Sequence, residues 1–80
     1  MPTIFQSKGF RFFLFRNDRA NPPHIHIESD NKYARFQLKP IELEKSIGYG
    51  VNELGEIRDL INTNLRFLSE KWDGYFTSEN

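Results

Sequence analysis

The chain has 80 residues, of which 38% are hydrophobic, 15% aromatic and 28% charged, and its formal net charge at pH 7 is zero. That length suits one small domain, assigned to residues 1–80, and the aromatic content is too high for a disordered chain. Cysteine is absent, which excludes disulfides, thiolate zinc sites and cysteine nucleophiles. No apolar run approaches the roughly 20 residues of a membrane span, and no signal peptide is recognisable. We therefore expect a cytoplasmic protein without membrane contact.

The zero net charge conceals a difference between the two halves of the chain. Residues 1–40 carry seven basic and three acidic side chains, whereas residues 41–80 carry four basic and eight acidic ones. A basic N-terminal half suits phosphate or an acidic partner, and it also suits the acidic half of the same molecule.

Residues 3–43 are predicted to form a small antiparallel sheet of two hairpins. In the first hairpin, a turn at residues 7–9 precedes an aromatic strand over Phe10–Arg16. The second hairpin is predicted from strict alternation of side-chain type in residues 24–28 and 33–38.

The register of the second hairpin follows from a two-residue turn at Asp30 and Asn31. The predicted cross-strand pairs are His24 with Gln37, Ile25 with Phe36, His26 with Arg35, Ile27 with Ala34, and Glu28 with Tyr33. Apolar residues then lie opposite apolar ones and polar residues opposite polar ones. We expect the apolar face of this hairpin to be buried against a helix.

A single long helix is predicted over residues 52–76, with Asn52 as its N-cap. Its apolar side chains recur three or four residues apart, at Leu54, Ile57, Ile61, Leu65, Leu68, Trp72 and Tyr75. Asn64 is the polar interruption of that stripe. The expected fold class is therefore α+β, a small antiparallel sheet packed against one long C-terminal helix.

The residues with the most chemical potential lie on the second hairpin. His24, His26 and Glu28 are two residues apart along a strand, so they share the face that points away from the helix. The predicted register adds Arg35 and Tyr33 to that face. We interpret it as the solvent-exposed working surface of the protein.

Partner binding is the main hypothesis for this surface. Arg11, Phe13, Phe15 and Tyr33 are expected to lie exposed beside the histidines, and such residues are common in protein interfaces. The partner would be another protein, with a second copy of the chain as a further possibility.

Metal-independent RNA cleavage is the first alternative. His24 or His26 would act as acid or base, Glu28 as its complement, and Arg35 would stabilise the charge on a phosphorane. An exposed Phe of the first hairpin would stack on a base, which makes RNA a candidate partner.

Metal binding is the second alternative. Two imidazoles and a carboxylate, from His24, His26 and Glu28, can bind zinc or iron and leave a position for water. The positive charge of Arg35 opposite His26 disfavours a cation there. No cofactor is otherwise expected.

The chain also resembles a bacterial family of short proteins, family 4160 of the domains of unknown function. The similarity lies in Met1–Phe5, Gly9–Phe13, Pro22–Ile27, Ala34–Leu38, Pro40 and Glu70–Phe76, and the PPHIHI segment is its most specific part. Genes of this family often stand beside another small gene, an arrangement that resembles toxin–antitoxin modules. The resemblance therefore implies a cognate partner and assigns no activity.

Overall fold

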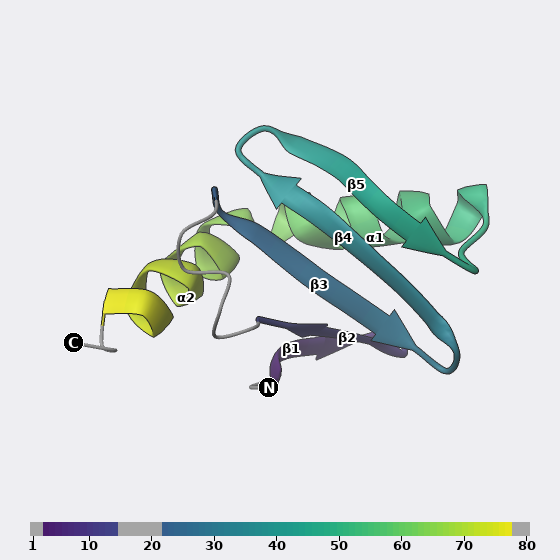
Figure 1. Cartoon of the computed structure of the whole chain (residues 1–80), viewed down its shortest axis with the longest axis horizontal. Helices are drawn as coiled ribbons and strands as arrows, with labels where there is room; N and C mark the ends of the chain where they lie inside the picture. Colours follow the sequence, from purple (N-terminus) through teal and green to yellow (C-terminus); the bar gives the residue numbers. More distant parts are fainter. Residues whose placement is uncertain (1–2, 15–21, 78–80) are drawn as a thin grey trace.

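The computed structural model describes residues 3–14 and 22–77 of the chain. Within these residues it forms five strands and two helices (Figure 1). In chain order these are β1 (Thr3–Ser7), β2 (Phe10–Phe13), β3 (His24–Ser29), β4 (Lys32–Leu38), β5 (Ile41–Ile47), α1 (Val51–Thr63) and α2 (Leu65–Thr77). The strands make one antiparallel sheet whose spatial order equals the chain order, β1-β2-β3-β4-β5. The predicted α+β class is confirmed.

The hairpin of β3 and β4 has the predicted register at every pair, from His24 opposite Gln37 to Glu28 opposite Tyr33. Its turn lies at Asp30 and Asn31, and Asp30 takes a positive φ of 51° that a short polar side chain tolerates. Alternation of side chains and turn chemistry thus agree, which is why this part of the sheet was predictable.

The first hairpin turns at Lys8 and Gly9, both with positive φ, as the sequence indicates. Its second strand is shorter than predicted, because β2 ends at Phe13. Phe15 and Arg16, which the prediction included in the strand, lie outside the described residues.

The sheet also extends beyond its predicted end at residue 43, since β5 continues to Ile47. β4 and β5 are joined through a cis Lys39–Pro40 peptide bond. Their register shifts between Arg35 and Phe36, so that Glu44 has no opposite residue in β4. A bulge of this kind changes the direction of the side chains that follow it.

The predicted single helix is wrong, because the helical region is divided at Asn64. Both the backbone N–H of Asn64 and its side-chain amide donate to the carbonyl of Leu60, at 3.0 and 2.8 Å. A side chain that competes for a helical carbonyl favours a helix end. The predicted N-cap is also displaced: Gly50 caps α1, Asn52 lies inside it, and Glu53 Oε1 accepts from the Gly50 N–H at 3.1 Å.

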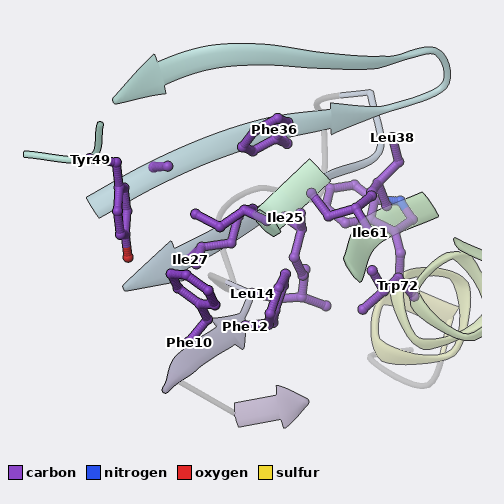
Figure 2. Packing of buried hydrophobic residues seen from close by; sticks show 13 residues of the cluster. Phe10, Phe12, Leu14, Ile25, Ile27, Phe36, Leu38, Tyr49, Ile61 and Trp72 are labelled. Carbon is purple, nitrogen blue, oxygen red and sulfur yellow. The ribbon is translucent and has the colours of Figure 1, made fainter. Parts of the chain in front are cut away.

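The hydrophobic core lies between one face of the sheet and the two helices (Figure 2). All the hairpin residues predicted to face the helix are buried there, namely Ile25, Ile27, Ala34, Phe36 and Leu38. From the helices, Ile57, Ile61, Leu68 and Trp72 complete the same cluster, whereas the side chain of Tyr75 lies outside the described ones. The core therefore occupies one face of the sheet and leaves the histidines on the other.

No helix among the described residues is long and apolar enough to cross a membrane.

Candidate functional site

The face that bears the histidines is more buried than predicted. His24 is 5% exposed, His26 3% and Phe13 2%, so the expectation of a solvent-exposed surface is wrong for these residues. Phe15, the other ring expected there, lies outside the described residues. The buried rings therefore cannot serve as an open contact surface.

Ring contacts explain part of this burial. His26 stacks on Phe13 with ring centroids 5.3 Å apart and on Tyr33 at 5.9 Å. His24 lies edge-on to His26 at 5.0 Å and contacts Trp72 of α2 at 5.2 Å. Alternation along one strand shows which face a side chain takes, but not that neighbouring rings will cover it.

Hydrogen bonds fix both imidazoles. His24 Nδ1 donates to the carbonyl of Pro22 at 2.9 Å, so in the neutral ring Nε2 carries no proton. His26 Nδ1 and the hydroxyl of Tyr33 are 2.6 Å apart. The predicted pairing of β3 with β4 thus places His26 beside Tyr33. Pro22, just before β3, provides the carbonyl that accepts from His24.

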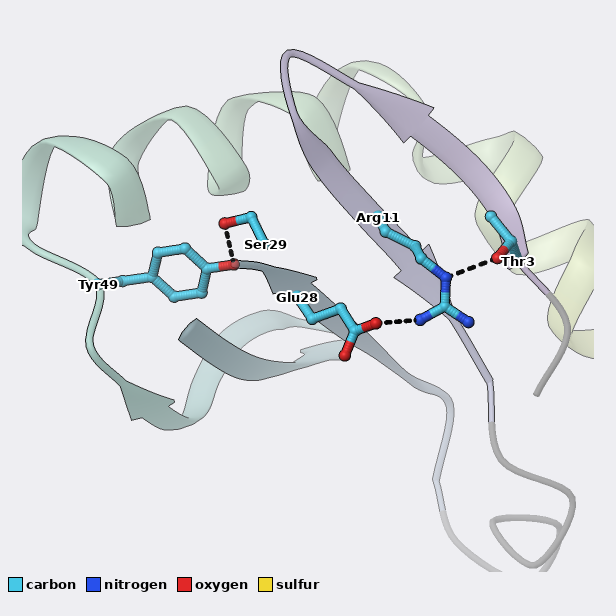
Figure 3. A network of polar contacts seen from close by, with 5 residues as sticks. All are labelled: Thr3, Arg11, Glu28, Ser29 and Tyr49. Atoms are coloured by element: carbon cyan, nitrogen blue, oxygen red, sulfur yellow. Dashed lines mark hydrogen bonds and ion pairs between the residues drawn. The ribbon is translucent and has the colours of Figure 1, made fainter. Parts of the chain in front are cut away.

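Glu28 forms an ion pair with Arg11 (Figure 3). Its carboxylate is therefore paired with an arginine, whereas the predicted role as an acid–base complement requires pairing with a histidine. Arg11 Nη1 donates to Glu28 Oε1, and Arg11 Nε donates to Thr3 Oγ1 at 2.7 Å. The guanidinium carbon also lies 4.5 Å from the centroid of the Phe13 ring. Arg11, predicted as a contact residue, therefore ties β1, β2 and β3 together.

A second polar group lies next to Glu28, at the C-terminal end of β3. The hydroxyls of Ser29 and Tyr49 are 3.0 Å apart (Figure 3), and burial raises the pKa of Tyr49. Lys32 Nζ donates to Glu53 Oε2 at 2.7 Å. This hydrogen bond raises the pKa of Lys32 and lowers that of Glu53. These contacts connect the sheet to the start of α1.

Arg35 pairs with a carboxylate that sequence reasoning missed. Arg35 Nε lies 3.0 Å from Glu44 Oε1, but the N–H is not directed at the oxygen, so the contact is an ion pair without a hydrogen bond. Pro22, His24, Arg35 and Glu44 line a pocket of about 250 Å³. No periodic signal identifies Glu44, because the bulge in β5 sets its direction.

The predicted site is thus only partly assembled. His24 and Arg35 share the pocket, His26 and Tyr33 share a hydrogen bond, and Glu28 belongs to a different ion pair. Among the residues that the structure describes, no three His, Asp or Glu side chains are placed to hold a metal ion. The set of His24, His26 and Glu28 is therefore not brought together as zinc or iron ligands.

The chain is similar to a known family of protein domains. Residues 9–73 match the family described as "Domain of unknown function (DUF4160)". The chain belongs to the DUF4160 family. The matched region runs from β2 into α2 and includes His24, Arg35 and Glu44, so the pocket lies within it. No curated protein and no solved structure matches the chain.

Proposed function

We propose that this DUF4160 protein is the partner-binding component of a toxin–antitoxin-like pair, and that its partner adds a strand to the β1 edge of the sheet. The observation that carries this proposal is a difference between the sheet edges. β5 bears Glu42, Glu44 and Lys45, whereas β1 contains no charged residue. Charged side chains protect an edge strand from pairing, so an uncharged edge remains competent to accept one.

Aromatic side chains beside β1 support the same surface. Phe5 of β1 packs edge-on against Phe12, with centroids 5.2 Å apart, and contacts Phe67 of α2 at 6.1 Å. Phe67 is 40% exposed. A strand added to β1 would cover this ring, and partly exposed aromatic residues are the usual anchors of protein interfaces.

The charge around this edge favours an acidic partner. Lys71 Nζ lies 5.4 Å from the centroid of the Phe67 ring, and Lys8 is exposed in the turn that follows β1. The basic N-terminal half of the chain agrees with this sign. The partner is a small cognate protein encoded beside this one, an arrangement taken from the family resemblance.

The test is co-purification with the product of the neighbouring gene. Phe67→Glu places a negative charge on the proposed surface, and we expect it to weaken the complex about tenfold or more because anchor residues dominate interface energies. Val51→Glu is the matched control, since Val51 is 86% exposed and lies at the first residue of α1. The control should bind normally.

A complex that forms equally well with Phe67→Glu would contradict this location. Failure of the two wild-type proteins to associate would contradict the function itself. A dimer of the purified chain that Phe67→Glu converts to a monomer would identify a second copy, rather than a cognate protein, as the occupant of the edge.

Metal-independent RNA cleavage is a second candidate, favoured by the pocket. His24 would act as acid or base, Arg35 would hold phosphate, and Glu44 would take the place first assigned to Glu28. The burial of Phe13 and His26 weighs against this candidate, because neither ring is open to a base. Cleavage of RNA in the presence of a chelator by the wild type, lost in Arg35→Met and Glu44→Gln, would favour it over partner binding.

A further inference from the structure

We propose that the pocket lined by Pro22, His24, Arg35 and Glu44 binds a phosphoryl group that still carries a proton, either as inorganic phosphate or as a phosphate monoester. The proposal concerns binding alone. It therefore depends neither on the partner at β1 nor on RNA cleavage.

Arg35 supplies the positive charge. A guanidinium has five N–H donors and binds oxyanions through paired hydrogen bonds. Glu44 accompanies only its Nε, which is buried, and the structure gives its terminal nitrogens no hydrogen-bond partner among the described residues. The side chain is 40% exposed, and that exposure lies on atoms other than Nε. The donor capacity of Arg35 is thus left for a ligand.

Glu44 decides which oxyanion fits. A carboxylate repels an anion that offers only lone pairs, but it accepts a hydrogen bond from one that carries an O–H group. Phosphate monoesters have a second pKa of about 6 and that of inorganic phosphate is higher, so a protonated form of each is present near neutral pH. Sulfate and carboxylates have no such proton at that pH. A site with Arg35 and Glu44 together therefore favours phosphate over sulfate.

His24 and the size of the pocket agree with this ligand. The bond from His24 Nδ1 to the Pro22 carbonyl, at 2.9 Å, fixes the imidazole that forms part of the pocket wall. The wall combines the donor groups of Arg35 with the acceptor oxygens of Glu44, which matches a group that is both P–O⁻ and P–OH. The volume of about 250 Å³ lies below the range of pockets for drug-sized ligands, so a single small group suits it.

The experiment is a titration of the folded full-length protein with inorganic phosphate or sulfate at matched ionic strength, followed by NMR. We expect phosphate to shift the side-chain signals of His24 and Arg35 saturably, and sulfate to bind about tenfold more weakly or worse. Arg35→Met should weaken phosphate binding about tenfold or more, the loss expected for charged hydrogen bonds. Glu44→Gln should abolish the preference for phosphate.

Arg66→Met is the matched control, because the Arg66 side chain is 93% exposed and forms an ion pair with Glu70 of its own helix. It removes the same charge as Arg35→Met, and phosphate binding should stay unchanged. Equal binding of sulfate and phosphate by the wild type would overturn the proposal. Binding that survives Arg35→Met, or that falls equally in Arg66→Met, would also overturn it.

A second arm uses adenosine 5′-monophosphate. Saturable binding with the same dependence on Arg35 assigns the site to phosphate monoesters, whereas binding of inorganic phosphate alone assigns it to the free ion. If neither ligand binds, the proposal fails even when a partner complex forms at β1.

Discussion

The Arg11–Glu28 and Arg35–Glu44 pairs lie on the same face of the sheet and differ in how completely the arginine is used. Arg11 bonds Thr3 and Glu28 and rests on the ring of Phe13, so the pair spans three strands. Arg35 meets Glu44 without a hydrogen bond and borders a pocket. The same residue types therefore serve the fold in one place and leave binding capacity in the other.

The two pairs also show why only one of them can be inferred from the positions of charged residues in the sequence. Arg11 and Glu28 are opposite one another in neighbouring strands, as a regular register requires. Glu44 reaches Arg35 because it is the extra residue of a bulge. Regular strand pairing thus allows Arg11 to form a hydrogen bond with Glu28. The bulge in β5 instead leaves Arg35 and Glu44 as an ion pair without a hydrogen bond.

The largest effect should come from the ring beneath Arg11. Phe13→Ala removes a side chain that is 2% exposed and stacks on His26, so we expect the free energy of unfolding to fall by about 3–5 kcal/mol. Chemical denaturation measures this loss. Phe67→Ala, at a partly exposed ring, should cost much less, and equal losses at the two positions would show that Phe13 is not a structural support.

Neutralising the two glutamates compares the pairs directly. Glu28→Gln should destabilise the fold by about 1 kcal/mol, because a partly exposed hydrogen-bonded ion pair is worth little more than that. Glu44→Gln should change stability by less, since its contact with Arg35 lacks a hydrogen bond. Denaturant midpoints of the two variants decide the matter, and a larger loss for Glu44→Gln would reverse the comparison.

A smaller change isolates the hydrogen bond between His26 and Tyr33. Tyr33→Phe keeps the ring stack and removes the hydroxyl that lies 2.6 Å from His26 Nδ1. We expect a loss of about 1 kcal/mol in unfolding free energy, the usual contribution of one hydrogen bond. A changed NMR signal of His26 should accompany it. An unchanged His26 signal would mean that the hydroxyl does not bond the ring in solution.

The weakest effect is the pH dependence of the Lys32–Glu53 pair. The lowered pKa of Glu53 means that its contribution is present above the ordinary glutamate pKa of 4.5 and is lost as pH falls through the folded value. The raised pKa of Lys32 means that its contribution is present below 10.5 and is lost as pH rises through the folded value.

Thermal melts of Glu53→Gln across this range should therefore show a flatter fall in stability on the acid side than the wild type shows. Glu56→Gln, an exposed glutamate in the same helix, serves as the control and should keep the wild-type profile. A wild-type profile in Glu53→Gln as well would remove this pair from the account of stability.

Much of the fold could be predicted from particular residues, because their signals were local. The alternation around Ile25 and Phe36 and the turn at Asp30 gave the hairpin register without error. The spacing of the apolar residues on both sides of Asn64 is that of one continuous helix. The helix is nevertheless divided there, where the Asn64 side chain donates a hydrogen bond to the Leu60 carbonyl. The periodicity of apolar residues does not reveal such a hydrogen bond.

The candidate site was less predictable, because its geometry depends on distant elements. The burial of His24 involves Trp72 of α2, and the role of Glu28 depends on Arg11 in another strand. Glu44 depends on a bulge. Sequence reasoning identified His24 and Arg35 but could not place them against these neighbours.

The contact between His24 and Trp72 has a consequence for how the protein folds. Each strand of the sheet pairs with its neighbour in the chain, so we expect these local pairings to form before contacts between more distant parts of the chain. The contact between Trp72 and His24 joins residues that are far apart in the sequence, with β4, β5 and α1 between them. Because the chain contains a single tryptophan, its fluorescence should report the docking of α2, and we expect this signal to change later than a probe of sheet formation.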